Sequence, residues 1–218
     1  MISQGLFFSL ATYLFGSVPF GKLIAKRVAS IDITKRGSQN IGATNVAREL
    51  GTVWGVVTLF LDMLKGYIPI TLYISYASQT TDCYSIGLSA VMLSALIGHQ
   101  FSIFLRFKGG KGVGTATGIY LALSPISCLL AAVLFILIVY KWDFVSLGSI
   151  VSTSAMPLLL AFSGKEQSLI ICSALIAALI ILKHRENIQR MLKGEERKWQ
   201  ERRPHASRSR SRSNSSSE

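Results

Sequence analysis

Three short polar stretches carry the residues whose types and spacing could do chemistry. They run from Arg36 to Gly51 (RGSQNIGATNVARELG), from Arg106 to Thr115 (RFKGGKGVGT) and from Lys183 to Gly194 (KHRENIQRMLKG). Each lies next to a long hydrophobic segment. If all three lie on one side of a membrane, they form one cationic, glycine-lined pocket that also carries His, Asn and Ser side chains.

The second stretch has the composition of a phosphate cradle. Gly109, Gly110 and Gly112 leave backbone N–H groups uncovered, and Lys108 and Lys111 add positive charge just before a hydrophobic helix begins. The GxxxxGK[ST] spacing of a P-loop is absent. A flexible basic turn at the inner leaflet stays open as the alternative.

The first stretch offers hydrogen-bonding groups for a phosphorylated, hydroxylated substrate. Arg48 can bind a phosphate through two parallel hydrogen bonds, and the amide side chains of Asn40 and Asn45 can hold hydroxyl groups. The loop also offers the hydroxyl groups of Ser38 and Thr44. The alternative is a glycine-rich connector whose Asn and Ser side chains bond only to their own loop.

The third stretch supplies a candidate proton acceptor. His184 and Asn187 are three residues apart, so both face the same way on a helix, in basic surroundings. A neutral histidine oriented by an asparagine can take up a proton. A histidine that simply lies at the membrane interface is the alternative. His99, near the end of an earlier hydrophobic segment, is a further candidate for contact with the substrate.

Other kinds of active site are not indicated. No Ser-His-Asp triad can be recognised, and no His, Cys, Asp and Glu residues have metal-binding spacing. The three loops contain few carboxylates, so the pocket has little means to hold a divalent cation. We expect an anion site that uses neither metal nor cofactor.

The elements that must position these loops are hydrophobic helices. Half of the 218 residues are hydrophobic, the mean hydropathy is +0.44 and the net charge is +12. Long apolar segments alternate with short basic ones, which is typical of a multi-pass membrane protein. We expect an all-α fold with seven spanning helices, near Ile2–Ala25, Thr52–Tyr76, Ser85–Leu105, Val113–Leu123, Pro125–Tyr140, Phe144–Phe162 and Ser168–Leu182.

The distribution of positive charge determines the count of seven. Dividing the segment 113–140 at Pro125 places all but Lys65 and Lys165 of the 23 Lys and Arg residues on the cytoplasmic side, together with the three loops. Lys65 lies three residues after Asp62 in the second helix, so the two can form an ion pair. The pair has either a structural role or direct contact with substrate.

The chain divides into a membrane domain, residues 1–200, and a basic tail, residues 201–218, in which Arg and Ser alternate. The tail cannot bury apolar surface and should be disordered. For a tail on a membrane protein, lipid or no partner is favoured over RNA, so no nucleic-acid partner is expected. Two other classes remain as alternatives, a transporter of a phosphorylated solute and an RNA-tethering membrane anchor.

Taken together, the motifs resemble those of the bacterial membrane acyl-phosphate:glycerol-3-phosphate acyltransferases. The resemblance extends to about Lys198 and includes GSVPFG at 16–21, the three loops, LDMLKG in the second helix and GHQFSIFLRFKGGKGVGTATG at 98–118. The chain differs from the usual family pattern at Gln39, where Gly is usual, at Ser102, where Pro is common, and at Gly114, where Ala is common.

The resemblance implies seven helices in the bacterial inner membrane and an active site on the cytoplasmic side. It implies acyl transfer from acyl phosphate to the 1-hydroxyl of glycerol 3-phosphate, and transient contact with other enzymes of phospholipid synthesis. Catalytic roles fall on Ser38, Arg48, His184 and Asn187. The donor-phosphate loop falls on Lys108–Gly112. Substrate contacts are expected from Asn40, Thr44, Asn45, His99, Lys108, Gly109, Gly110, Lys111 and Gly112.

Overall fold

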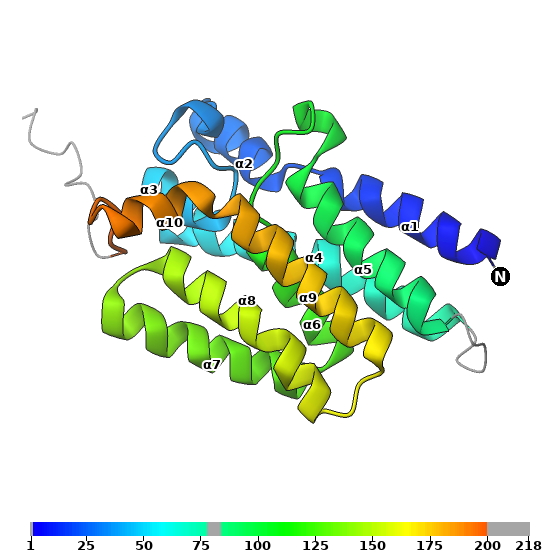
Figure 1. Cartoon of the computed structure of the whole chain (residues 1–218). Helices are drawn as coiled ribbons and strands as arrows, with labels where there is room; N and C mark the ends of the chain where they lie inside the picture. The colour runs from blue at the N-terminus through cyan, green and yellow to red at the C-terminus, as the bar shows by residue number, and fades with distance from the viewer. Residues whose placement is uncertain (1, 78–83, 200–218) are drawn as a thin grey trace, which may run out of the picture.

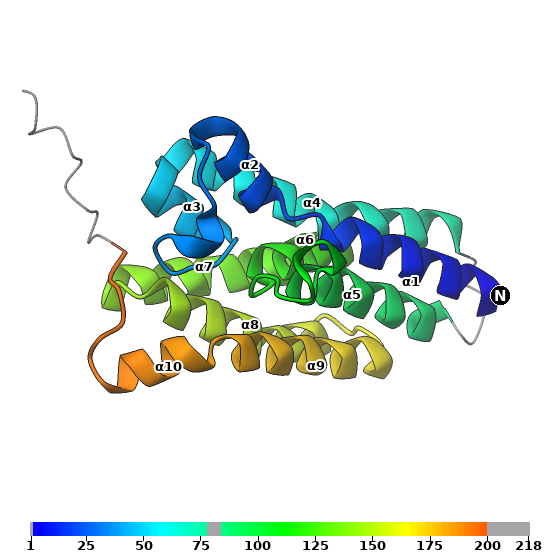
Figure 2. The same ribbon diagram turned by 90° about the horizontal axis from the view of Figure 1, so that it is seen from above.

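The computed structural model describes residues 2–77 and 84–199, and these residues form helices and connecting loops without strands. The predicted tail lies outside this part of the chain. The long helices lie alongside one another. The short helices α2, α3 and α10 gather at one end, opposite the N-terminus (Figures 1 and 2). The polar loops therefore lie at one end of the hydrophobic bundle.

The first predicted helix is broken. Its first part, α1 (Ile2–Ser17), ends before Val18-Pro19, and the chain continues as α2 (Phe20–Ala29). Proline has no backbone N–H to continue the helical ladder, so the helix is interrupted there, although Gly5–Ala29 still forms one candidate membrane span. A short 3-10 helix, η1 (Ile33–Lys35), and the eight-residue α3 (Ala43–Leu50) follow.

The central hydrophobic helices match the prediction closely. They are α4 (Thr52–Tyr76), α5 (Tyr84–Gln100), α7 (Pro125–Trp142), α8 (Val145–Phe162) and α9 (Gln167–Lys183). The third predicted helix ends earlier than expected, because residues 101–105 form a turn and the 3-10 helix η2 (Ile103–Leu105). Helix α10 (Arg185–Leu192) follows α9 with a bend of 58°.

The predicted division at Pro125 is confirmed, since α6 (Val113–Leu123) ends directly before it. With 11 residues, α6 is about 16 Å long, roughly half the thickness of a hydrocarbon core. In the described residues, five segments are long and apolar enough to cross a membrane, namely Gly5–Ala29, Thr52–Tyr76, Tyr84–Leu105, Pro125–Trp142 and Val145–Phe162. Helices α9 and α10 add a sixth if they are taken as one bent span. Helix α6 is not among them.

Close packing against α4 holds the short α6 inside the bundle. A Cβ atom on Gly66 would overlap the carbonyl of Thr115, and one on Gly118 would overlap the carbonyl of Met63. Glycine at these two positions therefore lets the two helix backbones touch. The side chains of Ile119 and Leu96 are fully buried in the same core. The N-terminus of α6 is thereby fixed beside the polar end of the molecule.

A second, smaller core supports the first polar loop. Ile41 and Val46, from the loop and α3, are buried against Ala25 of α2 and Ile33 of η1. Apolar residues are few in this stretch, and the structure places two of them in this cluster. The loop is therefore packed against α2 and η1 rather than projecting into solvent.

Candidate active site

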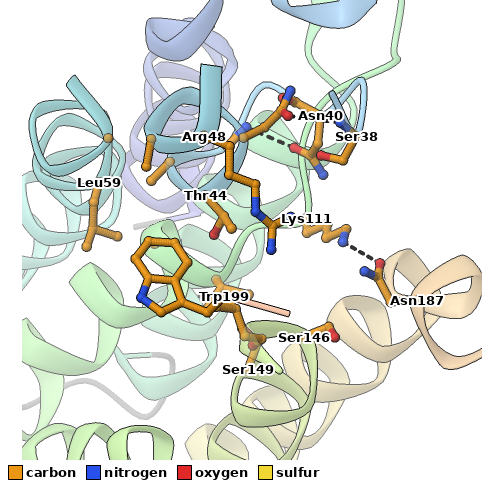
Figure 3. A pocket seen from close by; sticks show the side chains of 18 of the residues that line it. Ser38, Asn40, Thr44, Arg48, Leu59, Lys111, Ser146, Ser149, Asn187 and Trp199 are labelled. Atoms are coloured by element: carbon orange, nitrogen blue, oxygen red, sulfur yellow. Dashed lines mark hydrogen bonds between the residues drawn. The ribbon is translucent and has the colours of Figure 1, made fainter. Parts of the chain in front are cut away.

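The three polar stretches meet around one cavity of about 450 Å³ at the polar end of the bundle (Figure 3). Its walls come from α3, α4, the start of α6, α7, α8, the α9–α10 junction and the segment after α10. The sequence-predicted residues that line it are Ser38, Asn40, Thr44, Asn45, Arg48, His99, Lys111, Gly112, His184 and Asn187.

The remaining predicted residues, Lys108, Gly109 and Gly110, do not line the cavity. The Gly109 N–H donates to the Gln100 carbonyl and the Gly110 N–H to the His99 carbonyl, both at 3.1 Å. These amides therefore close the loop onto the end of α5 and cannot cradle a phosphate. The expectation of uncovered amides is wrong for these two glycines. The first turn of α6 takes their place, because its N–H groups have no intrahelical acceptor and Val113 and Gly114 line the cavity.

Asn45 organises the first loop. Its Oδ1 accepts a hydrogen bond from the Ser38 N–H at 2.9 Å, and its Nδ2 donates to the carbonyls of Asn40 (2.8 Å), Arg36 (3.1 Å) and Ile33 (3.4 Å). The side chain is 1% exposed. Its polar atoms are thus occupied within the loop, so Asn45 shapes the wall that carries Ser38 and has little capacity left for the predicted contact with substrate.

Gln39 lies in the left-handed backbone region, with φ +58°. This conformation costs a residue with a Cβ about 1–2 kcal/mol, whereas glycine adopts it without steric cost and loses about 0.5–1 kcal/mol through its greater chain entropy. The strain explains why glycine suits this position of the loop.

We therefore expect Gln39→Gly to stabilise the protein by about 0.5–1 kcal/mol. The measurement is the thermal unfolding midpoint of the detergent-solubilised protein, which should rise. Gln39→Ala keeps the Cβ and is the matched control, for which no rise is expected. A lower midpoint for Gln39→Gly would contradict the assigned strain.

His184 presents a basic nitrogen in its neutral form. Its Nδ1 lies 2.8 Å from the Ile180 carbonyl, which can only accept, so Nδ1 carries the hydrogen. The other ring nitrogen, Nε2, is then unprotonated. His184 is 2% exposed and lines the cavity. Its geometry fits a proton acceptor.

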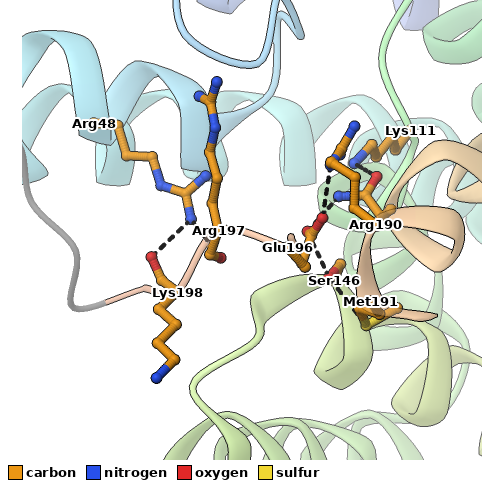
Figure 4. Close-up of polar contacts among 9 residues, drawn as sticks. Arg48, Lys111, Ser146, Arg190, Met191, Glu196, Arg197 and Lys198 are labelled. Carbon is orange, nitrogen blue, oxygen red and sulfur yellow. Dashed lines mark hydrogen bonds and ion pairs between the residues drawn. The ribbon is translucent and has the colours of Figure 1, made fainter. Parts of the chain in front are cut away.

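Asn187 connects the third stretch to the second. Its Oδ1 accepts from the Lys111 ammonium, and its Nδ2 donates to Glu196 Oε1 at 2.6 Å. Glu196 also accepts from Ser146 at 2.9 Å and from Arg190 at 2.9 Å (Figure 4). Burial acts to raise the Glu196 pKa, but these hydrogen bonds outweigh it and hold the pKa below its usual value.

The segment after α10 closes one side of the cavity. Glu196, Arg197 and Trp199 line it, and the backbone N–H of Trp199 donates to the Asp143 carbonyl at 2.8 Å. Arg48 Nη2 lies 3.4 Å from the Arg197 carbonyl and 3.3 Å from that of Lys198 (Figure 4). Sequence reasoning assigned no role to Glu196, Arg197 and Trp199. The sequence feature that could have indicated a role for this segment was the carboxylate of Glu196 within a basic stretch.

The electrostatics of the cavity favour a bound anion. Arg48, Lys111, Arg190 and Arg197 line it. Burial lowers the pKa of the Lys111 ammonium to about 8. Lys111 is therefore mostly charged at neutral pH but can lose its proton in the mildly alkaline range. In the described part of the chain, no group of three or more His, Cys, Asp or Glu side chains could hold a metal ion.

The opposite side of the cavity is apolar and faces the bundle. Its lining there comes from three helices and comprises Val56 and Leu59 of α4, Phe135 and Val139 of α7, and Val145 of α8. A ligand with an anionic group and a hydrocarbon chain would match both sides. The fold and cavity thus define a helical membrane protein with an amphiphile-binding site at one end of its bundle.

The sequence is similar to those of known proteins. The family model described as glycerol-3-phosphate acyltransferase matches residues 6–194. The glycerol-3-phosphate acyltransferase of Geotalea daltonii is 46% identical over 86% of this chain and 93% of its own length. That of Syntrophotalea carbinolica is 44% identical over 87% of this chain and 95% of its own.

Solved structures agree with the sequence relatives. The crystal structure of PlsY (YgiH), an integral membrane glycerol 3-phosphate acyltransferase, is 39% identical in its glycerol 3-phosphate form and covers 89% of this chain. The matched region covers 95% of the PlsY chain, and the TM-score is 0.84. The lysophosphatidic acid form gives a TM-score of 0.83 at the same identity. The chain belongs to the glycerol-3-phosphate acyltransferase family and is a multi-pass membrane protein.

Proposed function

We propose that this protein transfers a fatty acyl group from acyl phosphate to the 1-hydroxyl of glycerol 3-phosphate. The products are lysophosphatidic acid and inorganic phosphate, at the start of phospholipid synthesis. The observation that carries the proposal is the cavity itself, in which cationic groups and the N-terminus of α6 face an apolar wall. One side suits phosphate groups and the other suits an acyl chain.

Each substrate has a place in this arrangement. The donor's phosphate lies at Lys111 and the first turn of α6, with its chain along Leu59 and Val139. The acceptor's phosphate is held by Arg48. Thr44 and Asn40 lie on the same wall and can hold the acceptor's hydroxyl groups.

The reaction needs mainly positioning and charge stabilisation. The acceptor's O1 attacks the acyl carbonyl carbon, Nε2 of His184 takes the O1 proton, and Ser38 donates to the developing oxyanion. The bond from the carbonyl carbon to the phosphate oxygen then breaks, and phosphate leaves with its electron pair. Acyl phosphate already carries a good leaving group, so no metal or cofactor is required for these steps.

The proposal includes a topology and a location. Seven helices, α6 included, lie in the bacterial inner membrane, and the cavity opens on the cytoplasmic side. Residues 1–200 form the enzyme, and the basic tail 201–218 lies on the same side. Support comes from the distribution of Lys and Arg along the chain. Single cysteines placed at Lys35 and at Lys165 test this, because a membrane-impermeant thiol reagent added to intact cells should label only the second.

The donor is tested by offering the purified protein three sources of palmitoyl groups with glycerol 3-phosphate. Palmitoyl phosphate should yield lysophosphatidic acid, whereas palmitoyl-CoA and palmitoyl-acyl carrier protein should yield none. Product from a thioester and none from palmitoyl phosphate would overturn the donor while keeping acyl transfer. No product from any donor would overturn the proposed function.

The proposed use of Lys111 predicts a pH dependence. With a pKa of about 8, Lys111 loses its charge between pH 7 and pH 9. The charged fraction falls roughly tenfold over this range, so kcat/KM for palmitoyl phosphate should fall about tenfold as well. Lys111→Arg keeps its charge throughout, and its profile should lack this fall. An identical decline in both proteins would show that another group titrates.

A further inference from the structure

The apolar wall of the cavity contains two residues of α7 that lie one helical turn apart. Phe135 and Val139 are four residues apart, so they share a face of the helix, and both line the cavity. The end of α7 lies beside the segment after α10, because the Trp199 N–H bonds to the Asp143 carbonyl. Val139 is therefore nearer the polar loops, and Phe135 is about 6 Å farther into the bundle. A hydrocarbon chain that starts at the polar end passes Val139 first and Phe135 next.

The wall formed by α4 and α5 turns polar at the same depth. Asp62 and His99 line the cavity there, and Lys65 Nζ lies 2.7 Å from Asp62 Oδ1 and 3.5 Å from His99 Nδ1. The predicted ion pair is thus confirmed. A hydrocarbon chain placed against these groups would displace polar contacts without replacing them. The path along α7 is therefore the favourable one for a chain.

Gly148 of α8 supports this part of α7 from behind. It is buried and does not line the cavity itself. Helices α7 and α8 lie side by side (Figure 1). A Cβ atom on Gly148 would lie 2.8 Å from Val139 Cγ2 and 3.0 Å and 3.2 Å from Phe135 Cδ2 and Cε2. Carbon atoms in contact are about 3.5–4.0 Å apart, so the two side chains leave no space for one more methyl group.

The backbone of Gly148 does not explain why glycine occupies this position. The residue lies inside α8 with an ordinary helical conformation, and its N–H donates to the Phe144 carbonyl at 3.1 Å. Glycine inside a helix is less favourable than alanine. The contact that would require glycine here is therefore the one with Phe135 and Val139.

We propose that Gly148 is a positioning residue that sets the width of the acyl-chain site. It lets Phe135 and Val139 lie back against α8, which leaves room beside them for a long chain. A larger residue would push both side chains into the cavity, where there is space to receive them. The assignment rests on the proposed function for the identity of the chain as a fatty acyl group. The packing on Gly148 is independent of it.

Gly148→Ala tests the proposal through chain-length selectivity. The measured quantity is kcat/KM for palmitoyl phosphate divided by kcat/KM for octanoyl phosphate. The longer chain runs farther along α7, so it should suffer more from the displaced side chains. Space for one methylene group in an apolar pocket changes selectivity by about tenfold or more, so we expect the ratio to fall about tenfold. An unchanged ratio would overturn the proposal.

Gly87→Ala is the matched control for loss of stability. Gly87 is in α5, and a Cβ atom there would overlap the Tyr73 hydroxyl group. Neither of these residues lines the cavity. Both alanine substitutions overpack a contact between helices, so both should lower the thermal midpoint. Only Gly148→Ala should change the ratio. An equal fall in Gly87→Ala would assign the effect to a loosened bundle and contradict the role of Gly148.

Smaller residues on α7 should reverse the effect. Adding Phe135→Leu and Val139→Ala to Gly148→Ala removes the atoms that the new methyl group would meet, and we expect the ratio to recover to within threefold of that of the unmodified protein. A merely structural role would not be reversed, because two further truncations would destabilise the bundle more. A ratio that stays low would contradict action through these two side chains.

Binding of alkyl phosphates gives a readout that does not depend on acyl transfer. Hexadecyl phosphate and octyl phosphate carry the anion and the chain but have no acyl group to transfer. Calorimetry on the protein in lipid nanodiscs should show that Gly148→Ala weakens hexadecyl phosphate about tenfold more than octyl phosphate. Equal weakening of both would overturn the proposal. If no donor supports acyl transfer, the proposed function fails, and the binding ratio still decides the role of Gly148.

Discussion

Replacing Arg48 by alanine is expected to lower kcat/KM for glycerol 3-phosphate by about 10²–10³-fold. Arg48 lies in the last turn of α3 and lines the cavity, where its guanidinium group is proposed to hold the acceptor's phosphate through charged hydrogen bonds. Removing one partner of such a pair costs about 2–5 kcal/mol when the other is desolvated.

The shape of the group matters as well as its charge. Arg48→Lys keeps a positive charge but offers a point charge in place of a planar fork, so we expect it to recover only part of the lost activity. Steady-state kinetics at several acceptor concentrations provide the measurement. The thermal midpoint serves as a control for folding. Activity of Arg48→Ala within threefold of the unmodified protein would remove Arg48 from the phosphate site.

The second large effect is expected at Asn45, and it acts through structure. Alanine at this position leaves the carbonyls of Ile33, Arg36 and Asn40 and the Ser38 N–H without their present partner. Each buried polar group that loses its partner costs about 1–3 kcal/mol, and some will find water. A destabilisation on the order of 3–5 kcal/mol with loss of activity is therefore expected.

Two comparisons make this prediction specific. Asn45→Asp keeps the acceptor for Ser38 but turns a carboxylate oxygen toward three carbonyls, so it should be nearly as damaging as alanine. Asn40→Ala removes a single bond, from the Gly42 N–H to Asn40 Oδ1, and should cost about 1 kcal/mol. Thermal unfolding in detergent measures all three. A fully stable, active Asn45→Ala would show that the loop does not depend on this side chain.

The sequence was sufficient for the long helices and for most residues of the site. Long, mainly apolar segments specify α4, α8 and α9 to within a residue or two, and Pro125 marks the boundary between α6 and α7. The three polar stretches converge because the helices between them bring their ends to one side. That convergence could be anticipated from the charge distribution alone.

Other features depend on which hydrogen-bond partners a loop provides once it is folded. The amides of Gly109 and Gly110 looked available for phosphate, but the carbonyls that accept from them belong to the end of α5. Asn45 looked like a substrate ligand, yet its partners lie 5 to 12 residues before it in a folded loop. The sequence shows which groups can form hydrogen bonds, but the fold determines which partners they have.

The segment after α10 shows a different limit. Glu196 and Trp199 follow the last helix in a strongly charged stretch that has no apolar periodicity, so no pattern predicts where the chain turns. Its course is set by three hydrogen bonds to Glu196 and one from the Trp199 N–H.

The central claim is that the cavity transfers an acyl group from acyl phosphate to glycerol 3-phosphate. The most direct test measures phosphate release from palmitoyl phosphate by the purified protein, with and without glycerol 3-phosphate. Ser38→Ala, Arg48→Ala and His184→Ala are measured beside it. The account predicts release that requires the acceptor and that collapses in the Ser38 and Arg48 variants. Release that is independent of the acceptor, or equal in all four proteins, would contradict it.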